Sequence, residues 1–110
     1  MYIYNVTVNI EESVHDKWLK WMKEKHIPDM LGTGKFSSAK MCQVMVKEET
    51  GGITYSVQYT TDGIITLQEF YDQDAPRLRS EEMAIFKDKL LSFRTELKLI
   101  SEQFSMSLKN

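Results

Sequence analysis

The order in which hydrophobic patterns follow one another is the feature of this sequence that most limits its fold. Residues 2–10 alternate between apolar and polar side chains, as a half-buried strand does. A segment with helical spacing follows, then two alternating segments joined at Thr50-Gly51-Gly52, a helical crossover, and a last alternating segment over residues 91–99. Glycines supply the positive φ that a tight hairpin needs, so the two middle strands are expected to pair antiparallel. The order therefore reads as βαββαβ.

A βαββαβ order is that of the split βαβ, or ferredoxin-like, α+β fold. It predicts a four-stranded antiparallel sheet with helices on one face and a second face left over. A chain of 110 residues is the size of one domain. We expect that domain over residues 1–100 and a C-terminal tail over residues 101–110, which either frays or adds itself to a sheet edge.

Local signals set the expected boundaries of the elements. The first helix is expected from Glu11 to about His26, because the residue before Pro28 disfavours helical geometry. The second strand is expected from Phe36 to Lys47. The crossover is expected as two helical pieces, since Asp74 and then Pro76 mark a break and a new start.

The alternation also predicts which side chains share a face of the sheet. An aromatic layer is expected under the helices, either as plain core or as the lining of a ligand pocket: Tyr2, Tyr4, Tyr55, Tyr59, Phe93, Trp18 and Trp21. The leftover face is expected to be polar, with Asn5, Thr7, Asn9, Thr54, Ser56, Gln58, Arg94, Glu96 and Lys98, and with apolar contacts from Ile3, Met41 and Met45. Such a face is either solvated or a hydrogen-bonded dimer interface.

Charge and composition exclude several classes of partner. The formal net charge is −2 and the pI about 5.7, so no excess of cations is present to displace the counterions of DNA or RNA. No segment reads as a membrane span or a signal peptide. The single cysteine, Cys42, cannot form an intramolecular disulfide and is interpreted as buried filler. We therefore expect a cytoplasmic protein that binds neither nucleic acid nor membrane.

No motif in the sequence identifies a catalytic centre. His15 and His26 are eleven residues apart, roughly 16 Å along a helix, so one metal ion cannot be held by both within a subunit. We expect no metal and no cofactor. The carboxylate pairs, Glu81-Glu82 among them, are explained by capping and solvation, and Gly32-Thr33-Gly34 lacks the context of a phosphate-binding loop.

Several local strings together resemble a small bacterial family known only as a domain of unknown function. They extend over most of the chain to about Ile100: Trp18-Leu19-Lys20-Trp21-Met22, His26-Ile27-Pro28-Asp29-Met30, Thr33-Gly34-Lys35-Phe36, Ser56-Val57-Gln58-Tyr59 and Phe93-Arg94-Thr95. The resemblance implies the dimeric α+β barrel fold of antibiotic-biosynthesis monooxygenases, in which two ferredoxin-like subunits pack sheet against sheet. It favours the dimer interpretation of the polar face.

The resemblance implies no activity. Haem-degrading members of the wider superfamily use an Asn on the first strand together with a later Trp and His. Asn5 resembles the first of these, but the tryptophans and histidines of this chain fall outside the later positions. No catalytic residue can be carried over.

Two hypotheses of function remain, and they share a set of candidate residues. The first is a homodimer that binds a small molecule without an identifiable catalytic motif. The second is a cofactor-independent monooxygenase, or a related enzyme, acting on a small aromatic substrate, with His26 or Tyr55 moving a proton. The candidate pocket or interface residues are Asn5, Trp18, Trp21, His26, Tyr55, Gln58, Tyr59 and Arg94.

Overall fold

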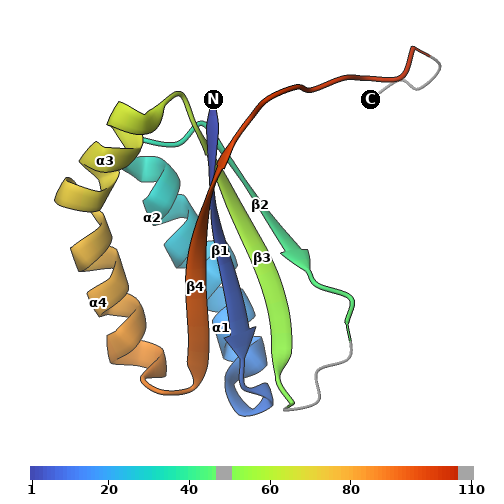
Figure 1. Cartoon of the computed structure of the whole chain (residues 1–110). Helices are drawn as coiled ribbons and strands as arrows, with labels where there is room; N and C mark the ends of the chain where they lie inside the picture. The colour runs from blue at the N-terminus through green and yellow to red at the C-terminus, as the bar shows by residue number, and fades with distance from the viewer. Residues whose placement is uncertain (47–50, 107–110) are drawn as a thin grey trace.

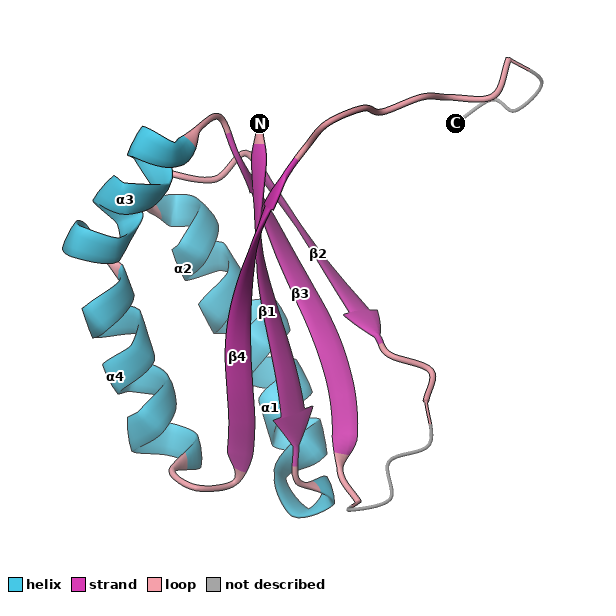
Figure 2. Cartoon of the chain, viewed as in Figure 1, coloured by secondary structure: helices cyan, strands magenta, loops and turns pink. Residues whose placement is uncertain are grey.

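A four-stranded antiparallel sheet carries the helices on one of its faces (Figure 1; Figure 2). The computed structural model describes residues 1–46 and 51–106. The strands lie in the order β2-β3-β1-β4 and are β1 (Tyr2–Ile10), β2 (Ser38–Gln43), β3 (Ile53–Thr61) and β4 (Leu90–Lys98). The helical segments are η1 (Glu12–Val14), α1 (His15–Trp21), η2 (Met22–His26), α2 (Ile27–Gly32), α3 (Ile64–Gln73) and α4 (Ala75–Phe86). The predicted βαββαβ order and α+β class are confirmed.

The central strand β1 sets the register of the sheet. Tyr4 lies opposite Tyr59 of β3 and opposite Glu96 of β4, and both pairings are antiparallel. Directly opposed residues point to the same face, so this row faces the helices. The predicted alternation of β1 and β3 is confirmed. Before β3, Gly51 and Gly52 have the predicted positive φ values, 85° and 80°, and Thr50 lies outside the described residues. The antiparallel pairing of β2 with β3 is confirmed, but β2 ends at Gln43 and β3 begins at Ile53, so the connection is longer than a tight hairpin.

The first helical segment does not end before Pro28 as expected, but continues through it to Gly32. Residues Met22–His26 form a turn of π-helix, and the Ile27 N–H donates to the carbonyl of Met22, five residues back. Pro28 then occupies the first turn of α2, where a missing N–H is tolerated. The wider turn is the physical reason why the proline does not break the helix.

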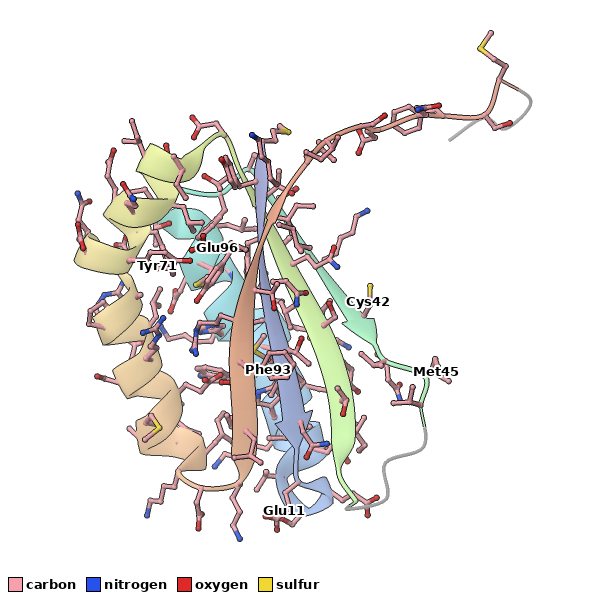
Figure 3. The ribbon with its side chains drawn as sticks, in the orientation of Figure 1. Glu11, Cys42, Met45, Tyr71, Phe93 and Glu96 are labelled. Atoms are coloured by element: carbon pink, nitrogen blue, oxygen red, sulfur yellow. The ribbon has the colours of Figure 1, made fainter. Side chains whose placement is uncertain are left out.

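The edge strand β2 is shorter than the expected Phe36–Lys47, of which Lys47 lies outside the described residues. Met41 opposes Val57 and packs against the core, so its expected place on the leftover face is wrong. Cys42 is exposed opposite Ser56, on the face away from the helices, and the expectation of buried filler is also wrong (Figure 3). A segment with apolar residues at both parities does not reveal which parity faces the core.

The edge strand β4 alternates as expected but with its two faces exchanged. Phe93 opposes Thr7, and so lies on the face away from the helices, whereas Arg94 opposes Val6 beneath them. Tyr71 of α3 donates a hydrogen bond to Glu96, and Figure 3 shows these two side chains meeting between α3 and β4. The expectations that Phe93 joins the aromatic layer and that Arg94, Glu96 and Lys98 lie on the leftover face are therefore wrong.

Because the two faces of β4 are exchanged, an apolar stripe runs along this strand on the face of the sheet that points away from the helices. Leu91 is 76% exposed, Phe93 63% and Leu97 40%, with Ile3 of β1 opposite Leu97. Polar residues cover the rest of this face, including Asn5 and Gln58, which oppose one another on β1 and β3. We call this surface the open face below.

The core lies between the other face of the sheet and the helices. Trp18 and Leu67 are fully buried there, and Phe36 packs between Tyr4 and Phe70, with ring centroids 6.0 and 4.9 Å away. The aromatic layer is thus largely packed core. The crossover consists of two helices that meet at Asp74, as expected.

Beyond β4 the chain runs away from the sheet (Figure 1). Ile100, Phe104 and Met106 are exposed by 83%, 71% and 101%. The predicted boundary between a domain and a tail at residue 100 stays a prediction, and residues 107–110 lie outside the described part of the chain. Among the described residues, the helices are too short or too polar to cross a bilayer.

Candidate functional site

A cavity of about 30 Å³ lies between the helix-facing side of the sheet and the surrounding helices. That volume holds roughly two water molecules or a chemical group of similar size. Strands β1, β3 and β4 form one wall, and η2, α2, α3 and α4 form the others. Its lining residues are Tyr4, Val6, Val8, Met22, His26, Met30, Val57, Tyr59, Phe70, Ala75, Leu78, Arg79, Glu82 and Arg94.

His26 reaches this cavity because of the π-helical turn that ends with it. On a regular α-helix, residues five apart point in different directions, whereas a π-turn brings them into line. The imidazole of His26 accordingly stacks on Trp21, with ring centroids 4.7 Å apart and an interplanar angle of 22°. Trp21 in turn packs edge-on against Phe86 of α4. The indole therefore holds the imidazole ring at the wall of the cavity.

The Nδ1 atom of His26 is buried and has no hydrogen-bond partner among the described residues. Leaving a buried polar atom unpaired costs about 1–3 kcal/mol, so such atoms are uncommon in folded proteins. The two other buried side-chain atoms without a partner in the described part of the chain, Nε1 of Trp18 and Oγ1 of Thr61, belong to residues that do not line the cavity. This atom is the clearest sign that the cavity is a site.

Burial lowers the pKa of His26 from its ordinary value of 6.5 to about 4. The carboxylates of Asp29 and Glu81 oppose this shift, while the cations of Lys25 and Arg94 add to it. The imidazole is thus neutral at pH 7. A neutral imidazole can accept a proton or donate a hydrogen bond, as a ligand requires.

Arg94 of β4 contributes the guanidinium of the site. Its Nε donates a hydrogen bond of 2.8 Å to the hydroxyl of Tyr4. Its remaining N–H groups have no partner among the hydrogen bonds and ion pairs of the described residues. Arg94 is an exposed residue, so these donors are open to water, and a ligand would have to replace that water. A planar guanidinium is suited to the oxygen atoms of a ligand.

Glu82 of α4 lies across the cavity from β4. Its burial raises the pKa of the carboxyl, an effect that the charge of Arg94 opposes. The two groups form no ion pair within 4.0 Å in the described part of the chain. Space between a guanidinium and a carboxyl, with a neutral imidazole beside them, allows binding of a molecule that has both a donor and an acceptor.

The structure brings three of the eight candidate residues to the cavity, namely His26, Tyr59 and Arg94. Trp21 stacks on His26 but does not itself line the cavity. Burial raises the pKa of the Tyr59 hydroxyl well above its ordinary range, so this phenol stays protonated at neutral pH.

Trp18 and Tyr55 belong to a separate cluster. Trp18 is fully buried, with its ring centroid 5.0 Å from that of Tyr55. The hydroxyl of Tyr55 lies 2.6 Å from Nε2 of His15, on the flank of α1. Neither residue lines the cavity, so the structure does not place Tyr55 where it could act on a ligand there.

Asn5 and Gln58 lie on the open face of the sheet, away from the cavity. The amide oxygen of Asn5 accepts a hydrogen bond of 2.6 Å from Ser56, and the amide nitrogen of Gln58 donates one of 3.4 Å to the same hydroxyl. These residues form a polar row across β1 and β3. Their proposed role in an interface remains a prediction.

Sequence reasoning missed Tyr4, Arg79 and Glu82 as site residues. Glu82 sits next to Glu81 in an exposed-looking helical stretch, and the pattern favoured solvation for both. Helical periodicity carried a weak signal, because Glu82 falls four residues after Leu78, which is 2% exposed and also lines the cavity. Within the described residues, His, Cys, Asp and Glu form no group of three or more that could hold a metal ion.

Solved structures with the same arrangement of elements share the fold at low sequence identity. An ethyl tert-butyl ether d (ethd) family protein from Bacillus halodurans C-125 has a TM-score of 0.66 at 13% identity, and the match covers 91% of this chain and 100% of that one. A dimeric ferredoxin-like protein from an uncultured marine organism has a TM-score of 0.63 at 7% identity, with 93% and 97% covered. A second dimeric ferredoxin-like protein, also from an uncultured marine organism, has a TM-score of 0.62 at 15% identity, with 94% and 98% covered.

These similarities show the ferredoxin-like fold. No curated protein matches the chain. The model of one protein family matches residues 1–100 of the 110-residue chain. The chain therefore belongs to the family described as Domain of unknown function (DUF4286).

Proposed function

We propose that this protein is a homodimer in which each copy binds a small molecule in the cavity between its sheet and its helices. One observation supports the binding function above all others: His26 lines the cavity, and its buried Nδ1 has no partner among the residues that the structure describes. Beside it are a guanidinium with free donors and a half-buried carboxyl, those of Arg94 and Glu82. Apolar walls with a few converging polar groups are typical of small-molecule sites.

The open face supports the dimer. Leu91 and Phe93 are exposed side by side with Leu97 on β4, and large apolar side chains clustered on one surface mark an interaction site. Two solved proteins that share this fold, each nearly over its full length, are described as dimeric. The open face has both a polar row and an apolar stripe. A second copy of the chain, packed sheet against sheet, would present the same two features and could cover them.

Cytoplasmic location remains part of the proposal. It is supported by the single cysteine, which the structure places on an exposed surface. An exposed thiol persists in a reducing compartment.

Replacing Phe93 with Glu should convert the dimer into monomers, because a charge would have to be buried in the apolar stripe. The matched control is Ile65→Glu on α3, which changes a side chain of similar exposure, 70% against 63%, on the opposite side of the molecule. Sedimentation velocity at micromolar concentration measures both. A wild-type protein that sediments as a monomer, or a Phe93→Glu variant that stays dimeric, contradicts the interface.

Filling the cavity should abolish ligand binding. Ala75 is 2% exposed and lines the cavity, whereas Ala84, on the same helix, is exposed and does not. We expect short organic acids such as acetate and propionate to raise the thermal midpoint of the wild type, since a ligand at tenfold its Kd stabilises by about 1.4 kcal/mol. Ala84→Leu should keep this response and Ala75→Leu should lose it. A response that is equal in both variants, or absent from the wild type across the whole set, argues against the cavity as the site.

Protonation of His26 should make the protein less stable in mild acid. The unfolded chain takes up a proton at this residue near pH 6.5, but the folded chain does so only near pH 4. The free energy of unfolding therefore falls as the pH is lowered between these values, by roughly 3 kcal/mol at about 1.4 kcal/mol per pKa unit. Above pH 6.5 the full contribution is present.

Urea unfolding at a series of pH values measures this dependence. His26→Gln should remove most of the fall between pH 6.5 and 5, where few carboxylates titrate, and His15→Gln should retain it. An unchanged slope in His26→Gln would show that the imidazole is not buried in its neutral form.

A second candidate function is proton-transfer catalysis in a cofactor-independent oxygenase. The position of His26 at the cavity supports it, although the lowered pKa makes this imidazole a weaker base than an ordinary histidine. At the mouth of the cavity, His26 would take one hydroxyl proton from a hydroquinone, whose anion passes two electrons to O2. The products are the quinone and H2O2, whose two hydrogens are the proton held by His26 and the second hydroxyl proton. Tyr55 drops out of this scheme, since it lies away from the cavity. Oxygen uptake with hydroquinones that falls at least tenfold in His26→Gln, but not in His15→Gln, would favour the enzyme; no uptake by the wild type would exclude it.

A further inference from the structure

The charges around the cavity point to the class of ligand. We infer that the cavity takes a small monocarboxylate, with its carboxylate on the guanidinium of Arg94 and its hydrocarbon part among the apolar walls. This inference rests on the proposal that the cavity binds a small molecule.

The guanidinium of Arg94 is the anchor for the anionic end. Its Nε is held by the Tyr4 hydroxyl at 2.8 Å, which fixes the plane of the group. No ion pair among the described residues neutralises its charge. A carboxylate can accept two parallel hydrogen bonds from such a fixed group, and charge-assisted bonds of this kind are about twice as strong as neutral ones.

The net charge of the lining favours a monoanion over a dianion. Arg94 and Arg79 contribute two positive charges, Glu82 contributes at most one negative charge, and the imidazole of His26 is neutral. One positive charge in excess matches a single carboxylate. A phosphate dianion would instead lie close to the carboxyl of Glu82 without enough cations to offset the repulsion.

His26 supplies the second polar contact. Its buried Nδ1 lacks a partner and, as an N–H, can donate to a carboxylate oxygen. The apolar part of the lining, with Met22, Met30, Phe70 and Leu78, then receives the hydrocarbon end. A cavity of about 30 Å³ limits that end to one or two carbon atoms.

Matched acids and amides test the inference without altering the protein. Acetate and propionate are titrated against acetamide and propionamide into the ¹⁵N-labelled full chain at pH 7, with concentrations up to about 50 mM to reach millimolar Kd values. Each pair has nearly the same shape and differs in charge. We expect each acid to bind at least tenfold more tightly than its amide, corresponding to about 1.4 kcal/mol.

Two variants assign that preference to one side chain. Arg94→Gln removes the charge and should bring the acid-to-amide ratio close to one. Arg77→Gln is the control: its side chain is exposed on α4, pairs with Glu81 and does not line the cavity. It should keep the full ratio. Amide spectra of each variant report whether the fold is intact, and the wild-type ratio stands even if Arg94→Gln does not fold.

The outcomes separate this inference from the binding proposal. Amides that bind as tightly as acids, with shifts at cavity residues, overturn the carboxylate inference and leave the binding proposal standing. Acids and amides that both fail to shift any cavity residue overturn both. A preference for acids that survives in Arg94→Gln also overturns the inference, since another group would then hold the anion.

Discussion

The antiparallel backbone ladder from Tyr2 opposite Lys98 to Ile10 opposite Leu90 joins the edge strand β4 to the central strand β1 and sets its register. Within that register, Nε of Arg94 donates a hydrogen bond to the hydroxyl of Tyr4. Because side chains alternate along a strand, a slip of one residue would move every side chain of β4 to the other face. In the observed register, Arg94 points under the helices and Phe93 points away from them. The cavity and the open face both depend on this one register, so the binding proposal and the dimer proposal share a single structural cause.

The polar groups around the cavity lower the free energy of unfolding of the domain on its own. A neutral, buried imidazole with an unpaired nitrogen and a partly desolvated carboxyl both lower stability, because each has lost water without a full replacement. Apolar residues of similar size would pack the same space more stably. Polar groups that lower stability and cluster in one small cavity, here beside a guanidinium, are typical of binding sites.

Periodicity and local end signals were enough to predict β1, β3, the antiparallel pairing of β2 with β3 and the two-piece crossover. It failed at β4, where Leu91 and Phe93 alternate with Ser92 and Arg94: the pattern shows two faces but not which one is buried. It also failed at Pro28, because a π-turn depends on packing that no short motif reveals. His26, Tyr59 and Arg94 were among the candidates for the site, yet Glu82 was missed because its burial comes from the sheet opposite and not from its own helix.

Isotope-filtered nuclear Overhauser measurements test the register of β4, on which both proposals depend, most directly. A dimer mixed from ¹³C-labelled and unlabelled chains separates contacts between copies from contacts within one copy. The account predicts contacts between copies for the ring of Phe93 and only contacts within one copy, to Tyr4, for the side chain of Arg94. Contacts between copies at Arg94, with Phe93 meeting only its own helices, would contradict the register of β4 and with it both proposals.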